Sequence, residues 1–386
     1  MEIKQIYTLI NSVSNEVLGT TDIVNEDLTG VVDMGEAVFN QNAIDRYVRS
    51  LVNHIGKVVF VDRPYTGKIP SVLMDAWEFG SVLQKISADI PNATENDTWE
   101  LENGKQYNQD TFYKPTVTAK FFNSKVTFEV PVSITERQVK QSFSNAEQLN
   151  GFISMIYSAV EKSMTIKSDA LIMRTINNMI AETLISDANT FKEGYNAGST
   201  VRSVNLLFTY NQRFGRKLKV EEAILDADFI RYASYTMGLY TDRIASISTL
   251  FNIGGKERFT PRELLHVVLL SDFAKSAQTY LYSDTYNNEQ VLLPKAETVP
   301  SWQGTGLTYD FKSVSSIDVK SSSGKVVKVS GILGVMFDRD ALGVSNLDRR
   351  VTTNFNAKAE FFNNYYKFDA GYFNDTNENF VVFFIA

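Results

Sequence analysis

The sequence predicts an α+β protein. Residues 144–184 carry apolar side chains at helical spacing and contain no proline, so they are expected to form one long helix. Residues 79–133 and 351–386 contain runs that alternate apolar and polar side chains, as strands do. The chain has 386 residues, of which 44% are hydrophobic and 22% charged, which is enough to build two or three lobes.

The chain is predicted to begin with an N-terminal arm, residues 1–35, that contains a short helix near Ile3 to Val13. A firmer helix is expected from Glu36 to His54, because its apolar residues recur at helical spacing. Gly56 follows it, in the place where glycine commonly ends a helix. A strand from Lys57 to Val61 comes next.

Residues 79–133 are predicted to form a long two-stranded arm. Ser81 to Ile90 and Thr116 to Val132 have extended patterns, and Asn103–Gly104 between them is a strong signal for a hairpin turn. Pro131 cannot donate a backbone hydrogen bond, so it favours an edge position in a sheet. A two-stranded ribbon is not stable alone in water, so the arm needs another surface to lie on.

The long helix has a clear start. Ser144 to Glu147 has the pattern of a capping box, in which the serine and glutamate side chains satisfy free backbone N–H groups. A single helix over residues 145–184 would be about 60 Å long and would act as a spine that joins separate regions. The alternative at this point is a pair of helices broken near Thr165–Ile166.

Residues 198–345 mix helices and strands. A loop with two prolines is expected from Val291 to Trp302, and the Ser-Ser-Ser-Gly stretch at 321–324 predicts a hairpin turn. Helices are predicted at Val220–Tyr232, Pro261–Leu270 and Phe273–Leu281, and the hairpin strands at Val314–Lys320 and Lys325–Ile332.

The last residues, Glu378 to Ala386, are strongly apolar. Exposed, such a segment would be an aggregation site, because an uncovered apolar strand pairs readily with other chains. It is therefore predicted to be a buried strand.

No catalytic, cofactor or metal site is predicted. The chain has no cysteine, which excludes thiol nucleophiles, thiolate metal sites and disulfides. The two histidines, His54 and His266, cannot form a zinc-protease motif, and each is interpreted as a packed or half-buried imidazole. Asp375 to Asn379 imitates the start of a calcium loop, but Phe380 stands where that loop needs glycine.

The net charge is −7, whereas proteins that grip phosphates usually carry a basic excess. The chain contains no run of 18 apolar residues and no signal peptide, so it is expected to be soluble and intracellular where it is made, with no membrane contact. Several charged groups are interpreted as solvated surface, with nucleic-acid contact a lesser alternative for the basic ones. They are the acidic pairs Glu221/Glu222, Asp226/Asp228 and Asp338/Asp340, and the basic cluster Arg213, Arg216, Lys217 and Lys219.

This order of elements resembles the major capsid proteins of tailed bacteriophages, which have the Hong Kong 97 type fold. The segment from Phe337 to Val344, through Tyr365 to Asp369, and on to Phe384 is similar to the C-terminal part of capsid proteins from small podophages of Gram-positive hosts. The resemblance implies six parts of the chain. They are an N-terminal arm (1–35), the first part of a peripheral domain (36–78), a β-hairpin arm called the E-loop (79–133), a spine helix (134–197), an axial domain (198–345) and peripheral return strands (346–386).

The resemblance also implies a function and partners. Pentamers and hexamers of the chain would form an icosahedral or prolate head shell around phage double-stranded DNA, which would contact the inner face non-specifically. A portal protein is an expected partner, scaffold and decoration proteins are further candidates, and no cofactor is expected. The shell would be part of the virion and would be assembled in the host cytoplasm.

Four aromatic residues of the arm are the candidate contacts between subunits: Trp99, Tyr107, Phe112 and Tyr113. They lie in a polar stretch around the predicted tip, residues 92–112, where they would otherwise be exposed to water. Aromatic side chains of this kind commonly anchor interfaces. We therefore expect the arm to pack on a neighbouring subunit.

Three other functions stay open from the sequence. An encapsulin-type nanocompartment would use the same fold around a cargo enzyme. An enzyme with an unrecognised site would need a catalytic group outside the motifs considered above. A tail or tube protein would form open helical stacks instead of closed shells.

Overall fold

The computed structural model describes residues 3–19, 46–47, 50, 69, 72–74, 83–91, 93, 95, 103–104, 110, 112, 114, 116–135, 146–187, 198–282, 296–302, 310–321, 324–359 and 361–386. Its helices are α1 (Ile3–Leu18), α5 (Ala146–Ser186), α6 (Leu206–Phe214), α7 (Val220–Ala223), α8 (Ala227–Ile244), α9 (Ser271–Tyr282) and α10 (Phe311–Val314). Its strands are β1 (Leu73–Met74), β2 (Leu83–Ala88), β3 (Val117–Phe122), β4 (Lys125–Thr135), β5 (Ser203–Asn205), β6 (Leu265–Leu270), β7 (Glu297–Val299), β8 (Ile317–Lys320), β9 (Val326–Val329), β10 (Ile332–Asp338), β11 (Leu342–Asn356), β12 (Phe361–Asn374) and β13 (Phe380–Phe384).

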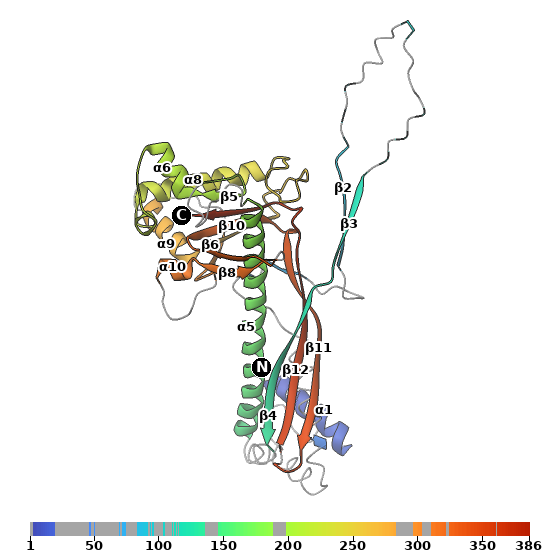
Figure 1. The fold of residues 1–386 in the computed structure, drawn as a ribbon. Coiled ribbons are helices and arrows are strands. Elements are labelled where there is room, and N and C mark those ends of the chain that lie inside the picture. The colour runs from blue at the N-terminus through green and yellow to red at the C-terminus, as the bar shows by residue number, and fades with distance from the viewer. Residues whose placement is uncertain are drawn as a thin grey trace.

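The helix α5 is the axis of the molecule (Figure 1). It runs for 41 residues without a break, so the two-helix alternative is wrong and the single spine is confirmed. Ile156, Val160 and Met164 are buried on one side of its first half. Its second half is apolar on most sides between Leu171 and Leu184 and is buried accordingly, as expected for a helix without a polar face.

A four-stranded sheet with the order β1-β11-β12-β4 lies along α5. The long strands β11 and β12 are antiparallel, and β12 pairs with β4 in the same way, so that Phe368 lies opposite Phe128 with ring centroids 5.0 Å apart. Burial alternates along β12 because one face of the sheet packs on the helix. Pro131 lies in β4, at the edge of this sheet among the described strands, as predicted.

A five-stranded sheet with the order β5-β13-β10-β6-β7 forms the second region. Its central strand β10 and the neighbouring strand β13 are buried at every residue. The helices α5, α6 and α9 pack on the sheet, and α8 packs on α6 and α9. The predicted buried strand at the end of the sequence is therefore confirmed. The segment 346–386 does not form the single set of return strands expected from the sequence, because β12 lies in the four-stranded sheet and β13 lies here.

Two predicted helices need correction. The helix expected at Pro261–Leu270 is wrong, because Leu265–Leu270 is the strand β6, paired with β10 on one side and β7 on the other. A short apolar run buried on both faces has no periodicity that separates helix from strand. The helix expected at Val220–Tyr232 is two helices, because the Asp226 carboxylate accepts the backbone N–H of Phe229 and begins α8 anew.

The other elements agree more closely with expectation. The N-terminal helix α1 continues to Leu18, beyond the predicted end at Val13. The helix α9 and the hairpin of β8 and β9 are confirmed, whereas the predicted loop Val291–Trp302 contains the short strand β7. Of the helix predicted at 36–54, the described residues 46, 47 and 50 are helical, and the strand predicted at 57–61 lies outside the described residues.

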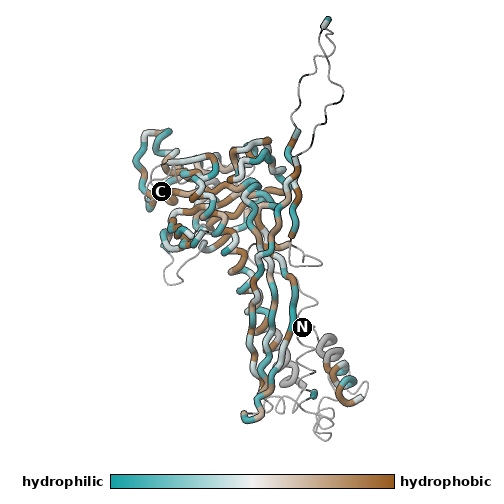
Figure 2. Tube along the Cα trace, turned by 45° about the vertical axis from the view of Figure 1, so that its right-hand side comes forward, coloured by the Kyte–Doolittle hydropathy of each residue, from teal (hydrophilic) through white to brown (hydrophobic). Residues whose placement is uncertain are grey.

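The overall shape is elongated. The five-stranded sheet and its helices lie at one end of α5, the four-stranded sheet lies along the helix, and the ribbon of β2 and β3 leaves the molecule on the far side from α6 and α8 (Figure 1). Hydrophobic residues are concentrated around the five-stranded sheet, but they also alternate along the ribbon (Figure 2). The ribbon therefore carries apolar residues far from the core.

Candidate assembly surface

The arm is an antiparallel ribbon in which β2 and β3 pair from Leu83 opposite Phe122 to Ala88 opposite Val117. The predicted pairing of the two extended segments is confirmed. The predicted second strand, however, is divided. From Lys125 onward the chain forms β4, which pairs with β12 in the four-stranded sheet and so belongs to the body of the subunit.

Strand alternation gives the ribbon two different faces. Its outer face consists of Gln84, Ile86, Ala88, Val117, Ala119 and Phe121, and all six are exposed. The large side chains of this face are far more exposed than is usual for their type, at 64% for Ile86, 55% for Val117 and 64% for Phe121. Five of the six residues are apolar, so the outer face is a hydrophobic strip in contact with water. Such a strip on a protein surface marks an interaction site.

The inner face of the ribbon consists of Leu83, Lys85, Ser87, Thr118, Lys120 and Phe122, and it turns toward the body of the same subunit. Phe122 packs on Phe373 of β12, with ring centroids 5.1 Å apart. Lys85 and Lys120 are cross-strand partners, and both reach the turn between β12 and β13. The polarity of the ribbon is thus opposite to that of an ordinary surface hairpin, whose charged residues face water.

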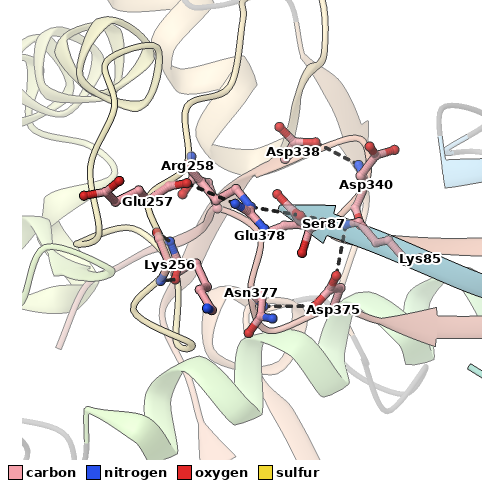
Figure 3. Close-up of polar contacts among 12 residues, drawn as sticks. Lys85, Ser87, Lys256, Glu257, Arg258, Asp338, Asp340, Asp375, Asn377 and Glu378 are labelled. Carbon is pink, nitrogen blue, oxygen red and sulfur yellow. Dashed lines mark hydrogen bonds and ion pairs between the residues drawn. The ribbon is translucent and has the colours of Figure 1, made fainter. Parts of the chain in front are cut away.

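A group of ion pairs, here called the arm-base cluster, holds the ribbon to the body. It consists of Lys85, Lys120, Asp375, Glu378 and Arg258, which Figure 3 shows in part. The Asp375 carboxylate forms ion pairs with two lysines: Lys120 Nζ lies 2.8 Å from Oδ1, and Lys85 Nζ lies 3.0 Å from Oδ2. Only 2% of the Asp375 side chain is exposed. The Glu378 carboxylate forms ion pairs with Lys85 Nζ at 2.7 Å and with Arg258 Nε at 3.3 Å.

A further ion pair adjoins the cluster at the end of β2. The Nζ atom of Lys256 lies 3.0 Å from both carboxylate oxygens of Asp89. Lys256 and Arg258 belong to the segment after α8. The Asn252 side chain stabilises this segment, because its amide donates to the Lys256 carbonyl and its oxygen accepts the Lys256 backbone N–H. The arm therefore contacts two separate loops of the body.

The electrostatics of the cluster favour its charged form. Burial by itself would raise the pKa of Asp375, but hydrogen bonds from Lys120, the backbone N–H of Asn377 and Lys85 outweigh it and hold that pKa below its ordinary value. Burial would likewise lower the pKa of Lys85, but Glu378 and Asp375 outweigh it and raise that pKa. Both groups are charged at neutral pH.

Of the four predicted contact residues, the structure describes Phe112, whose side chain is 84% exposed. Trp99, Tyr107 and Tyr113 lie outside the described residues. The sequence analysis missed Ile86, Val117 and Phe121. The signal was present, since these apolar residues alternate with Lys85 and Lys120, but such alternation is ordinarily interpreted as apolar inside and charged outside.

Several of the charged groups considered in the sequence make contacts within the subunit. Glu221 pairs with Lys312 at 2.7 Å, and Asp228 pairs with Arg216 at 3.0 Å. Asp338 accepts the hydroxyl of Thr260 at 2.7 Å. One member of each acidic pair thus has a contact within the subunit, and only Asp338 of these groups is buried.

His266 lies in β6, with its ring 5.7 Å from that of Phe337. Its partial burial lowers its pKa, which agrees with the predicted half-buried imidazole. His54 lies outside the described residues. Within the described part of the chain, no group of three or more His, Asp and Glu side chains is arranged to hold a metal ion, and no helix is long and apolar enough to cross a membrane.

The sequence matches the Phi29-like phage major capsid protein family over residues 8–384. The chain belongs to this family. It is therefore a phage major capsid protein, a structural component of the virion head, and its family is not a class of enzymes. A search of curated proteins found no match.

Solved structures agree with this assignment. A chain in the capsid structure of Staphylococcus phage Andhra is 7% identical, with a TM-score of 0.51, and the match covers 84% of this chain and 86% of that one. A chain from the structure of the head fiber and inner core protein gp22 of native bacteriophage P68 is 7% identical, with a TM-score of 0.50 and coverage of 85% and 86%. At such low identity these likenesses show the fold alone, which is the predicted Hong Kong 97 type capsid fold.

The resemblance to phage major capsid proteins is thus confirmed, and the encapsulin-type alternative is not favoured. The narrower likeness to podophages of Gram-positive hosts stays a prediction. A capsid shell consists of many copies of its major protein, so every exposed surface of this chain is a candidate contact with another copy.

Proposed function

We propose that the outer face of the β2–β3 arm is the surface by which one capsid subunit binds the next. The observation that carries this proposal is the exposure of Ile86, Val117 and Phe121 on a ribbon whose lysines turn inward. Apolar area gains about 25 cal/mol per Å² when it leaves water, so covering this strip stabilises the assembled form. Head-to-tail contacts of this kind close into rings.

These rings are the pentamers and hexamers of the head shell, and the arm tip with Trp99, Tyr107, Phe112 and Tyr113 extends the same contact. In this proposal the spine and the four-stranded sheet form the peripheral domain, and the five-stranded sheet forms the axial domain. The strand β13, expected among the peripheral return strands 346–386, then belongs to the axial domain. Each contact can be weak, because a closed shell repeats it many times.

The shell encloses double-stranded DNA, and assembly takes place in the host cytoplasm. The net charge of −7 supports a container that does not hold DNA tightly, since phosphate contacts made by many Lys and Arg residues would hinder its movement. A portal protein occupies one vertex of such a head, and scaffold or decoration proteins are further partners. The subunit carries out no catalysis in this role.

The test is the double substitution Ile86→Ser and Phe121→Ser, with Val326→Ser as the matched control. Val326 is 59% exposed on β9, outside the arm. Loss of a buried large apolar side chain costs about 1.5–3 kcal/mol, and every 1.4 kcal/mol changes an association constant about tenfold. We expect the subunit concentration needed for shells to rise at least about tenfold for the double variant.

Electron microscopy and sedimentation of the purified protein measure this concentration. The melting temperature of the free subunit is expected to stay unchanged, because the substituted side chains contact water there. Shells that form from the double variant at the same concentration as from the parent would contradict the proposal. The control variant is expected to assemble as the parent does.

A further inference from the structure

The arm-base cluster contains an arrangement that neither the fold nor the family explains by itself. Lys85 and Lys120 lie directly opposite each other on the inner face of the ribbon. Like charges in this position repel and destabilise a strand pair. Here the Asp375 carboxylate binds both lysines, one through each oxygen, at 3.0 Å and 2.8 Å. One buried carboxylate thus joins the two strands of the arm to the body of the subunit.

Two attachments restrict the arm more than one would. A single ion pair would leave the ribbon able to turn about its long axis. Attachment through one lysine on each strand fixes which face of the ribbon is turned toward the body. Figure 3 shows the contact between Lys85 and Asp375. The opposite, apolar face is then directed outward, where a neighbouring subunit can reach it.

The body side of the cluster is itself rigid. In the turn between β12 and β13, the backbone N–H of Asn377 donates to the Asp375 carboxylate at 3.0 Å. The backbone N–H of Gly254 donates to the carbonyl of Thr376 at 2.9 Å. Gly254 also packs so closely that an added β-carbon would lie 2.1 Å from Asn377 Oδ1. The turn is thus held against the segment that carries Lys256 and Arg258.

The remaining charges of the cluster are also paired. Lys85 donates to Glu378 and to the backbone carbonyl of Asp340, at 2.7 Å and 3.1 Å. Arg258 lies against the same Glu378 oxygen. Removing one member of a buried ion pair leaves a buried charge without compensation, so the arrangement is strongly specified.

From these contacts we propose that the arm-base cluster is a clamp that orients the arm in the free subunit, before a neighbour binds. Lys85, Lys120 and Asp375 are its positioning residues. In this proposal they act on the contact between subunits through the direction of the ribbon. Preorganisation of this kind lowers the cost of ordering a flexible segment on binding. The inference rests on the proposed role of the arm, but its test uses unassembled subunits.

The test measures the direction of the arm directly. The chain has no cysteine, so cysteines introduced at Thr116 and Lys217 can carry two spin labels without background. Thr116 is exposed at the end of the ribbon, and Lys217 is exposed between α6 and α7. Double electron–electron resonance on free subunits then gives the distribution of distances between arm and body. A narrow distribution is expected for the parent.

Asp375→Asn removes the negative charge shared by the two lysines and keeps the size of the side chain. Lys120→Met removes one of the two attachments, at a side chain that is 34% exposed. Both variants are expected to lose the narrow distribution, and Lys120→Arg, which keeps the charge, is expected to retain it. Glu129→Gln is the control. It removes the partner of Lys367 at 3.4 Å, in the four-stranded sheet, and should leave the distribution narrow.

An unchanged narrow distribution in folded Asp375→Asn and Lys120→Met subunits would overturn the clamp. If Asp375→Asn fails to fold, the milder Lys120→Met decides the question. A broad distribution in the parent would also overturn it. None of these results depends on shell formation, so failure of the Ile86 and Phe121 variants to weaken assembly would refute the proposed contact and leave the clamp intact.

Discussion

Gly334 lies so close to Leu269 on the neighbouring strand that a β-carbon added to it would lie 2.5 Å from Leu269 Cδ2 and 2.9 Å from the carbonyl oxygen of Val268. This glycine is part of β10, at the centre of the five-stranded sheet. The end of the leucine side chain can move aside, but the carbonyl oxygen of Val268 belongs to the backbone, so an added β-carbon would displace one of the two strands. The sheet therefore has no room for any side chain at this position.

Gly334→Ala is accordingly expected to destabilise the subunit by about 1–3 kcal/mol, the usual cost of overpacking a core. Gly238→Ala is the matched control, because Gly238 lies in α8 with no atom near its added β-carbon. There alanine is expected to stabilise the helix by up to about 1 kcal/mol. Urea unfolding of the free subunit measures the free energy of unfolding of both variants. Equal stability of the two variants would refute the packing argument.

Ile156 and Ile166 offer a second matched pair on the spine. Ile156 is 2% exposed and Ile166 is 64% exposed on the same helix. Ile156→Ala should cost about 2–5 kcal/mol, the range for truncation of a buried side chain. Ile166→Ala should change the free energy of unfolding little, because its side chain is already in water. A small effect at Ile156 would show that the face of α5 assigned to the core is wrong.

The arm-base cluster is expected to tolerate a wide pH range. Asp375 has a lowered pKa, so its contribution is complete above its unfolded pKa of 3.8 and is lost as the pH falls through the still lower folded value. Lys85 has a raised pKa, so its contribution is complete below 10.5 and is lost as the pH rises through the higher folded value.

The distance distribution of the spin-labelled arm should therefore be the same at about pH 5 and about pH 9, and should broaden only in strong acid or strong base. Lys120, Glu378 and Arg258, the other charged groups of the cluster, each lie in an ion pair with an oppositely charged side chain. A transition near neutral pH would indicate that another group controls the arm. The control at each pH is the far-ultraviolet circular dichroism of the same sample.

The tip of the arm can be tested by replacing residues 95–110 with a two-residue Asn-Gly turn, which favours a tight hairpin. The folded body should be unaffected, with unchanged circular dichroism and melting cooperativity. Closed shells should fail to form or should become more sensitive to salt, because each subunit loses part of its overlap with the next. Normal shells would show that the tip makes no contact, and global unfolding would show that it belongs to the core.

Several features could be predicted from local patterns. The spine follows from a long helical pattern with no proline, and the arm follows from two extended segments around Asn103–Gly104. The buried strand β13 follows from its continuous apolar sequence. In each case the pattern that predicts the element lies within a short stretch of chain, and the contacts made in the folded subunit favour the same element.

Other features depend on partners that are distant in sequence. Lys120 and Asp375 are 255 positions apart, and Lys85 and Glu378 are 293 apart, so no spacing rule joins them. The sequence of β6 predicts a helix, and nothing local corrects this, because its burial on both faces comes from β10 and the helices around it. The direction of the arm's apolar face could not be predicted, because the alternation of Ile86 with Lys85 is the same whichever face is covered by the body.

The uninterrupted helix α5 also makes the subunit a lever. It contacts β4, β11 and β12 along one part of its length and β8 and β13 along another, so both sheets are attached to one rod. A tilt of about 5° moves the far end of a rod about 60 Å long by about 5 Å. If subunits form the proposed rings of different size, they can therefore meet different neighbours through small rotations of the whole body, while the hydrophobic core keeps its packing.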